Sequence, residues 1–138
     1  MTAAAAGMPE PLRDWVEDVL SFHKAFEMTI NEEPTVPSQR DIGLRLNLVE
    51  EEAEELRSAI IQNEGLEAVA DACADLIYVV IGTAISYGID LRPVWAEVQR
   101  SNMAKIGGRK REDGKWLKPE GWTPPDIQGA MARGELKR

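Results

Sequence analysis

The stretch 42–60 reads IGLRLNLVEEEAEELRSAI, and it decides the fold class. Its apolar residues recur three or four positions apart, which is the spacing of one face of an α-helix and not of a strand. Ser38, with Asp41 three residues later, resembles the capping box that starts a helix. The pattern predicts a helix from residue 38 to about residue 63. The apolar face consists of Ile42, Leu46, Val49, Ala53, Leu56 and Ile60.

Similar spacing predicts three more helices, over residues 11–28, 66–87 and 91–106. Gly88 suits the position just after a helix, and Asp90 suits the N-cap of the next one. The short connections favour antiparallel packing, so we expect an all-α, antiparallel four-helix bundle. An irregular C-terminal tail with tryptophans and prolines follows, in which Asp113 and Gly114 indicate a hairpin-type turn.

The size and charge of the chain narrow the classes of function. With 138 residues and 43% hydrophobic residues, we expect a single domain over residues 1–138, in which residues 1–8 are disordered, 12–106 form the helical core and 107–138 form a basic loop and tail. The net charge of −8 works against binding a nucleic-acid polymer.

The sequence also predicts a compartment. The apolar stretch 76–89 is shorter than the roughly 18 residues of a membrane span, and the N-terminus lacks the pattern of a signal peptide. The single cysteine, Cys73, cannot form an intramolecular disulfide, and its apolar surroundings predict a buried core residue. We therefore expect a cytoplasmic protein without a membrane partner.

Five glutamates crowd the middle of the second predicted helix, at positions 50–52, 54 and 55. Repulsion between carboxylates this close destabilises the helix unless cations bind between them. A solvent-exposed acidic face is nevertheless the commoner interpretation of such a pattern. Glu52 weakens that reading, because it falls on or beside the apolar face. A buried carboxylate needs a partner, and Arg45 and a divalent cation are both candidates.

The third predicted helix supplies further carboxylates. Asp71 and Asp75 are four residues apart and therefore share a face, directly before an apolar run. Antiparallel packing brings them opposite Glu51, Glu52 and Glu55. An all-oxygen site of this kind suits Mg²⁺ or Mn²⁺, not zinc. A di-iron bundle normally needs Glu-x-x-His motifs, which the one histidine of this chain cannot provide.

Several motifs resemble the all-α nucleoside triphosphate pyrophosphohydrolase superfamily, which includes MazG, dimeric dUTPases, dCTP pyrophosphatase and phosphoribosyl-ATP pyrophosphohydrolase. EEAEEL at 51–56 resembles the EExxE motif, and DLIY at 75–78 matches the end of the ExxD motif. Other segments resemble the MazG-like and Cof-like branch, including the MazG-like dUTP pyrophosphohydrolase of the deinococcal type. These segments are FHKAF at 22–26, SNMAK at 101–105, REDGK at 111–115 and LKP at 117–119.

The resemblance implies a Mg²⁺-dependent enzyme that hydrolyses a nucleoside triphosphate to the monophosphate and pyrophosphate. It assigns Glu52, Glu55 and Asp75 as metal ligands and Glu51 as the residue that orients or deprotonates water. Where the motif has its second glutamate this chain has Ala72, so Asp71 is a fourth candidate ligand from the neighbouring position. Six further residues are candidates for binding the substrate: Asn102, Lys105, Arg109, Lys110, Lys115 and His23.

The expected function is therefore house-cleaning hydrolysis of dUTP or a related nucleotide by a homodimer or tetramer. Two alternatives remain open. One is phosphoribosyl-ATP pyrophosphohydrolase. The other is a catalytically decayed, acidic, metal-binding helical dimer.

Overall fold

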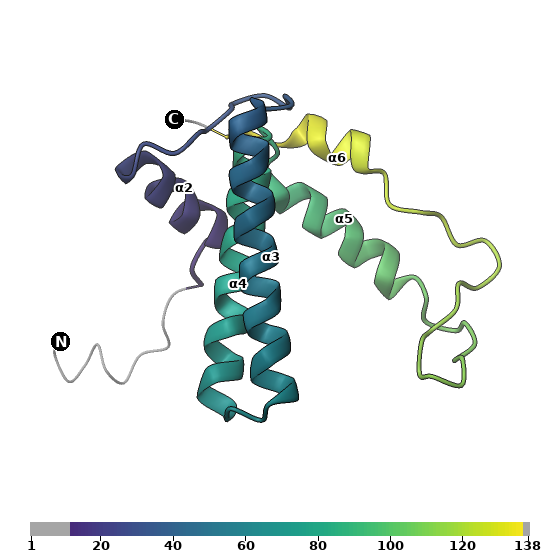
Figure 1. Ribbon diagram of the computed structural model, residues 1–138. Helices are drawn as coiled ribbons and strands as arrows, with labels where there is room; N and C mark the ends of the chain where they lie inside the picture. The colour runs from purple at the N-terminus through teal and green to yellow at the C-terminus, as the bar shows by residue number, and fades with distance from the viewer. Residues whose placement is uncertain (1–11, 137–138) are drawn as a thin grey trace, which may run out of the picture.

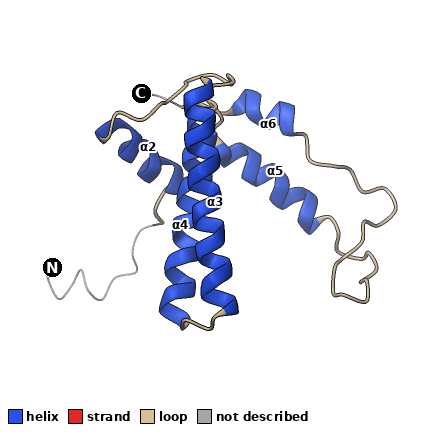
Figure 2. Cartoon of the chain, in the orientation of Figure 1, coloured by secondary structure: helices blue, strands red, loops and turns tan. Residues whose placement is uncertain are grey.

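The computed structural model describes residues 12–136, which form helices joined by loops (Figures 1 and 2). No strand occurs in this part of the chain, so the all-α class is confirmed. The helices are α2 (Trp15–Ala25), α3 (Gln39–Ile61), α4 (Leu66–Ser86), α5 (Leu91–Met103) and α6 (Ile127–Arg133).

Helices α3 and α4 form a long antiparallel hairpin at the centre of the molecule (Figure 1). The predicted cap of α3 is confirmed, because the hydroxyl of Ser38 accepts a hydrogen bond from the backbone N–H of Asp41 at 3.2 Å. A short turn then reverses the chain before α4. The antiparallel hairpin places the middle of α3 against the middle of α4, which is where the acidic residues of both helices lie.

Helix α2 packs on α4, and its start differs from the prediction. It begins at Trp15, later than expected, because the side chain of Asp14 accepts a hydrogen bond from the N–H of Glu17 and caps the helix there. The expectation of disorder over residues 1–8 lies outside the described residues.

The hydrophobic core lies where α2 meets the C-terminal half of α4. Residues distant in sequence join there, since Ile30 of the following loop and Leu136 near the C-terminus are both buried. The core residues are Val16, Val19, Leu20, Ile30, Ile81, Ile85 and Leu136, with Leu91 packed against them. This core fixes one end of the hairpin and leaves the acidic middle accessible.

Helix α5 diverges from the hairpin and packs on α6 instead (Figure 1). The four predicted helices therefore do not close into a complete bundle within a single chain. The tail is also less irregular than predicted, because α6 forms behind the N-cap Asp126. The predicted turn at Asp113 and Gly114 is confirmed, since the N–H of Arg111 bonds the carbonyl of Lys115 at 2.7 Å.

Two expectations about α4 need correction. Cys73 is exposed in this chain, because its neighbour Ala72 occupies the buried face. The apolar segment is also longer than the sequence indicated. Helix α4 is the one described helix that is long and apolar enough to cross a membrane, a property that core helices of soluble proteins share. Only 28% of its most apolar stretch is buried within the chain.

Asp90 ties the C-terminal segment to the start of α5. Its carboxylate accepts hydrogen bonds from the guanidinium of Arg92 at 2.9 and 3.0 Å and from the N–H of Glu135 at 3.0 Å. Arg92 also pairs with Asp14 at 2.8 Å, which connects this junction to α2. Burial raises the pKa of Asp90, but the hydrogen bonds from Arg92 and Glu135 outweigh it and leave the pKa below its usual value.

We expect Asp90→Asn to lower the free energy of unfolding by about 2 kcal/mol at neutral pH, discounted because Arg92 is 37% exposed. A carboxyl group with a lowered pKa stabilises the fold above its unfolded pKa, and the gain is lost as pH falls through the folded pKa. The difference between the two proteins should therefore shrink below about pH 4. Urea titrations across pH measure it, and a difference that stays constant down to about pH 2.5 contradicts this account.

Candidate metal centre and adjoining pocket

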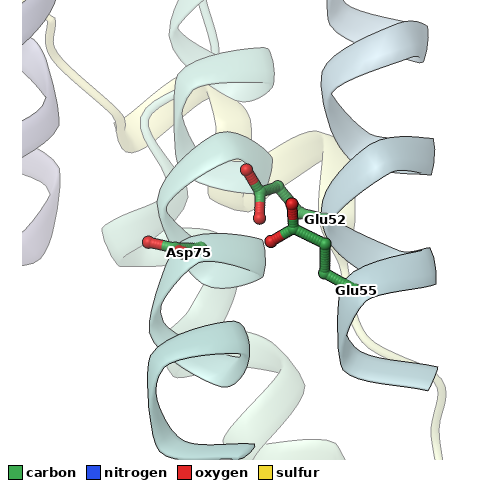
Figure 3. A group of neighbouring side chains, drawn as sticks. All are labelled: Glu52, Glu55 and Asp75. Atoms are coloured by element: carbon green, nitrogen blue, oxygen red, sulfur yellow. The ribbon is translucent and has the colours of Figure 1, made fainter. Parts of the chain in front are cut away.

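Three carboxylates meet between α3 and α4. Glu52 and Glu55 are adjacent on one face of α3 and reach toward α4, which carries Asp75 (Figure 3). One oxygen from each side chain lies within 4.8 Å of one oxygen from each of the other two. This spacing allows a single cation to contact all three groups.

The electrostatics of this group favour a cation. Burial raises the pKa of Glu52, and the charges of Glu55 and Asp75 raise it further. Burial likewise raises the pKa of Asp75, together with the charges of Asp71 and Glu55. Oε2 of Glu52 is also buried without a hydrogen-bond partner in the described part of the chain. A buried carboxylate oxygen normally has a partner, so these residues fit a hard divalent metal ion.

The other acidic candidates lie around this group without joining it. Asp71 is exposed one turn away on α4, and its oxygens are not among those that converge. Ala72 is buried, so the missing motif glutamate corresponds to an inward-facing position. Glu51 is exposed beside Glu52, where solvent can reach it. The structure thus brings together three of the four predicted ligands.

Arg45 does not pair with Glu52, contrary to one of the two expectations. Its side chain is 4% exposed and points to α4, where Nε donates to the hydroxyl of Thr83 at 3.2 Å and a terminal nitrogen donates to the carbonyl of Val79 at 2.9 Å. Burial lowers the pKa of Arg45, and the charge of Asp41 raises it. The guanidinium nevertheless stays protonated at any physiological pH.

A pocket of about 340 Å³ adjoins the carboxylates and extends along the hairpin toward α2. Such a volume is at the lower end of small-molecule sites. The sequence did not predict most of the residues that line this pocket, although helical spacing could have indicated them. Leu44 lies two helical turns before Glu52 and Leu48 lies one turn before it. Tyr78 lies one turn after Asp75. The lining residues are Val19, Phe22, His23, Met28, Leu44, Arg45, Leu48, Glu52, Asp75, Tyr78 and Val79.

His23 lines this pocket but is buried, and its protonation state follows from its contacts. Nδ1 lies 3.0 Å from the carbonyl oxygen of Thr29, which can only accept, so Nδ1 carries the proton. Burial lowers the pKa of His23, the bond to Thr29 raises it and the charge of Arg45 lowers it, with a net decrease. The imidazole is therefore neutral at pH 7, and its Nε2 is a hydrogen-bond acceptor.

The predicted basic residues lie elsewhere. Lys105 donates a hydrogen bond to the side chain of Asn102 at 2.9 Å. The backbones of Lys110 and Trp116 form an isolated antiparallel β-bridge on either side of the turn at Asp113 and Gly114. With Arg109 and Lys115 these two lysines form the basic loop, residues 105–118, which lies beyond the end of α5, away from the acidic part of the α3–α4 hairpin (Figure 1). Within one chain, therefore, the basic loop and the carboxylates are not brought together.

Comparisons with known proteins identify the relationship. Residues 19–102, more than half of the chain, match the model of the phosphoribosyl-ATP pyrophosphohydrolase family. An uncharacterized protein of Acanthamoeba polyphaga mimivirus is 44% identical over 50 residues, which are 36% of this chain and 20% of the viral protein. The chain thus spans about a fifth of that relative's length. The matched family segment contains all three converging carboxylates and every residue that lines the pocket. The chain therefore belongs to the phosphoribosyl-ATP pyrophosphohydrolase family, within the MazG-like superfamily of all-α nucleotide pyrophosphohydrolases.

Proposed function

We propose that this protein hydrolyses a (deoxy)nucleoside triphosphate, dUTP or a related nucleotide, to the monophosphate and pyrophosphate. The observation that carries the proposal is the buried, unpartnered oxygen of Glu52 within three converging carboxylates at the end of a pocket. Family membership supports nucleotide pyrophosphohydrolase activity in general. In this proposal the pocket holds the nucleoside, and the carboxylates with their metal hold the triphosphate.

Mg²⁺, or Mn²⁺ in its place, would be held by Glu52, Glu55 and Asp75. When bound, the cation supplies positive charge against the triphosphate and polarises its phosphoryl oxygens. Asp71 is one turn from Asp75 and contributes negative potential to it, which is consistent with a supporting role for Asp71.

Glu51 is the proposed general base. It is exposed beside Glu52, so a water molecule can reach its carboxylate. In the proposed reaction, Glu51 orients this water and accepts a proton from it as the water oxygen forms a bond to the α-phosphorus. The bond between the α-phosphorus and the oxygen that bridges the α- and β-phosphates breaks, and pyrophosphate leaves.

The pocket is the proposed site for the nucleoside. Phe22 and Tyr78 contact each other edge to face, with ring centroids 5.6 Å apart, and offer aromatic surface beside the carboxylates. Apolar side chains such as Leu44 and Leu48 line the rest of the pocket. This composition, apolar walls with few polar groups, is typical of small-ligand sites.

A second copy of the chain is the proposed partner, in a homodimer or a tetramer. Helix α4 leaves much of its apolar surface uncovered, and a groove of about 300 Å³ between α2 and α4 is lined mostly by apolar side chains, including Trp15 and Ile77. Such exposed apolar surface marks an association site. Assembly could also bring the basic loop of one copy, with Asn102 beside it, to the triphosphate held by the other.

We expect Ile77→Glu to weaken this association by at least about 100-fold, because a symmetric interface would bury the new charge twice. Ile77 is 42% exposed in the single chain, so the monomer should still fold. Light scattering during gel filtration measures the mass. Val36→Glu is the matched control, since Val36 is 72% exposed in a loop. A wild-type protein that is monomeric at about 100 μM contradicts the proposal.

The family match favours a second candidate, hydrolysis of phosphoribosyl-ATP, which needs the same carboxylates. Pyrophosphate release from a panel of nucleoside triphosphates and phosphoribosyl-ATP, with and without Mg²⁺, distinguishes the two. We expect turnover of dUTP or a related nucleotide, and only with metal. If phosphoribosyl-ATP alone is hydrolysed, the second candidate replaces the first. If a folded protein hydrolyses none of these nucleotides, the chain is the catalytically decayed, metal-binding dimer. Whether or not it is an enzyme, we propose that the protein is cytoplasmic.

A further inference from the structure

Arg45 is the one buried cation among the residues that line the pocket, and it makes no ion pair in the described part of the chain, although the charge of Asp41 acts on it from a distance. Among the described residues no carboxylate comes within ion-pair distance of it, and its two hydrogen bonds go to neutral groups, Thr83 and Val79. These bonds use two of the five N–H groups of a guanidinium. A buried cation in this state favours an additional acceptor, and the pocket is where one can enter.

Arg45 and the carboxylates mark opposite ends of the pocket. Arg45 precedes Glu52 by seven residues on α3, which corresponds to two turns and roughly 10 Å along the helix axis. The same separation holds on α4, where Gly82 beside Arg45 follows Asp75 by seven residues. The pocket therefore has an anionic end suited to a metal and a polyphosphate, and a cationic end beyond apolar walls.

The absence of a side chain at Gly82 lets Arg45 and His23 both approach the backbone of α4. A Cβ at residue 82 would lie 2.5 Å from a terminal nitrogen of Arg45 and 2.8 Å from Nε2 of His23, so both nitrogens lie against the bare backbone of α4. Arg45 can only donate hydrogen bonds, and Nε2 of His23 can only accept them, because Nδ1 carries the proton. The two polar side chains that line this end of the pocket thus comprise a hydrogen-bond donor and a hydrogen-bond acceptor.

We propose that Arg45 determines base specificity by donating to an exocyclic keto oxygen of the nucleobase, and so selects keto over amino pyrimidines. The inference rests on the proposed function, which fixes the phosphates at the Glu52 end. The substituent at position 4 of a pyrimidine lies opposite the bond to the sugar, and therefore reaches the far end of the pocket. A keto group there accepts from Arg45, and the protonated ring nitrogen beside it can donate to His23. A 4-amino group would place its N–H donors against the N–H donors of Arg45, and neither group would have a hydrogen-bond acceptor.

The test compares kcat/KM for dUTP and dCTP. We expect the wild-type protein to favour dUTP by at least about tenfold, and Arg45→Gln to bring the ratio to within about threefold of unity, because an amide both donates and accepts. Arg57→Gln, the same change at an exposed position of α3, should keep the wild-type ratio. A wild-type ratio near unity, or an Arg45→Gln ratio equal to wild type, overturns the proposal.

Thr83→Val provides a second variant, because Arg45 also connects α3 to α4 and its replacement could unfold the protein. Valine keeps the shape of threonine but removes the hydroxyl that holds Nε of Arg45 at 3.2 Å. We expect a smaller ratio than wild type, with a normal circular dichroism spectrum. An unchanged ratio in this folded variant overturns the proposal even if Arg45→Gln cannot be purified.

Binding separates this proposal from the proposed function. Calorimetry with α,β-imido analogues of dUTP and dCTP, in which the scissile bridge is nitrogen, needs no turnover. If no nucleotide is hydrolysed but the uracil analogue binds about tenfold tighter and Arg45→Gln removes the difference, the specificity proposal stands and the enzymatic one fails. If both nucleotides are hydrolysed equally, the enzymatic proposal stands and the specificity proposal fails.

Discussion

Glu52→Gln should reduce kcat/KM for the preferred nucleotide at least about 100-fold, which is roughly 2.7 kcal/mol of transition-state stabilisation. The amide retains the size of the side chain but removes one negative charge and one strong metal-binding oxygen. Glu52 is the most constrained of the three carboxylates, because its Oε2 is buried without a partner. Pyrophosphate release at saturating Mg²⁺ measures the effect.

The same substitution should not weaken the metal-free fold. Burial and the neighbouring charges raise the pKa of Glu52, and a carboxyl group whose pKa is raised by folding destabilises the folded protein once it ionises. Glutamine removes this cost, so the melting temperature in chelator should stay equal or rise. Mg²⁺ should then stabilise the wild-type protein, by mass action, much more than the variant.

Glu50→Gln is the matched control, since Glu50 is exposed on the same helix and takes no part in the converging group. It should retain both activity and the stabilisation by Mg²⁺. If Glu52→Gln keeps activity within about threefold of wild type, the metal assignment is wrong. If instead it loses activity and unfolds without metal, the residue has a structural role and not the proposed one.

Gly88→Ala should lower the free energy of unfolding by about 3–5 kcal/mol, a large fraction of the 5–15 kcal/mol that holds a typical domain together. Gly88 directly follows α4 with a φ of +70°, in the left-handed region. A side chain there adds strain of about 1–2 kcal/mol. Its Cβ would also overlap the backbone carbonyl of Glu33, which cannot rotate away as a side chain could.

The damage should extend beyond the turn, because the loop that carries Glu33 caps α4. The N–H of Thr35 donates to the carbonyl of Tyr87 at 2.9 Å, and the side chain of Asn31 donates to the carbonyl of Ser86 at 2.7 Å. Displacing this loop breaks those bonds and moves Ile30 out of the core. Gly107→Ala separates the two causes, since Gly107 has a φ of +91° but open space around it. Gly107→Ala should lower the free energy of unfolding only by the backbone strain. If urea titration gives equal losses of stability for the two variants, the overlap with Glu33 is not the cause.

The helices and most of their ends could be predicted from local chemistry. Apolar spacing determined α3 and α4, and the caps Ser38 and Asp90 marked starts that the structure confirms. Helix α6 was missed because its sequence, IQGAMAR, is short, contains glycine and has no long apolar face. It is stabilised by its cap and by packing on α5, and the second of these involves residues far away in the sequence.

The candidate site divides in the same way. The sequence by itself determined which carboxylates share a helical face, because the helical period fixes the positions of Glu52, Glu55 and Asp75 within their own helices. Only the tertiary structure decided what each face meets. It placed Arg45 against α4 and not against Glu52, left Cys73 exposed, and set the basic loop apart from the acidic residues. Helical period is a local property of the backbone, whereas the register and rotation of one helix against another depend on the packing of the whole chain.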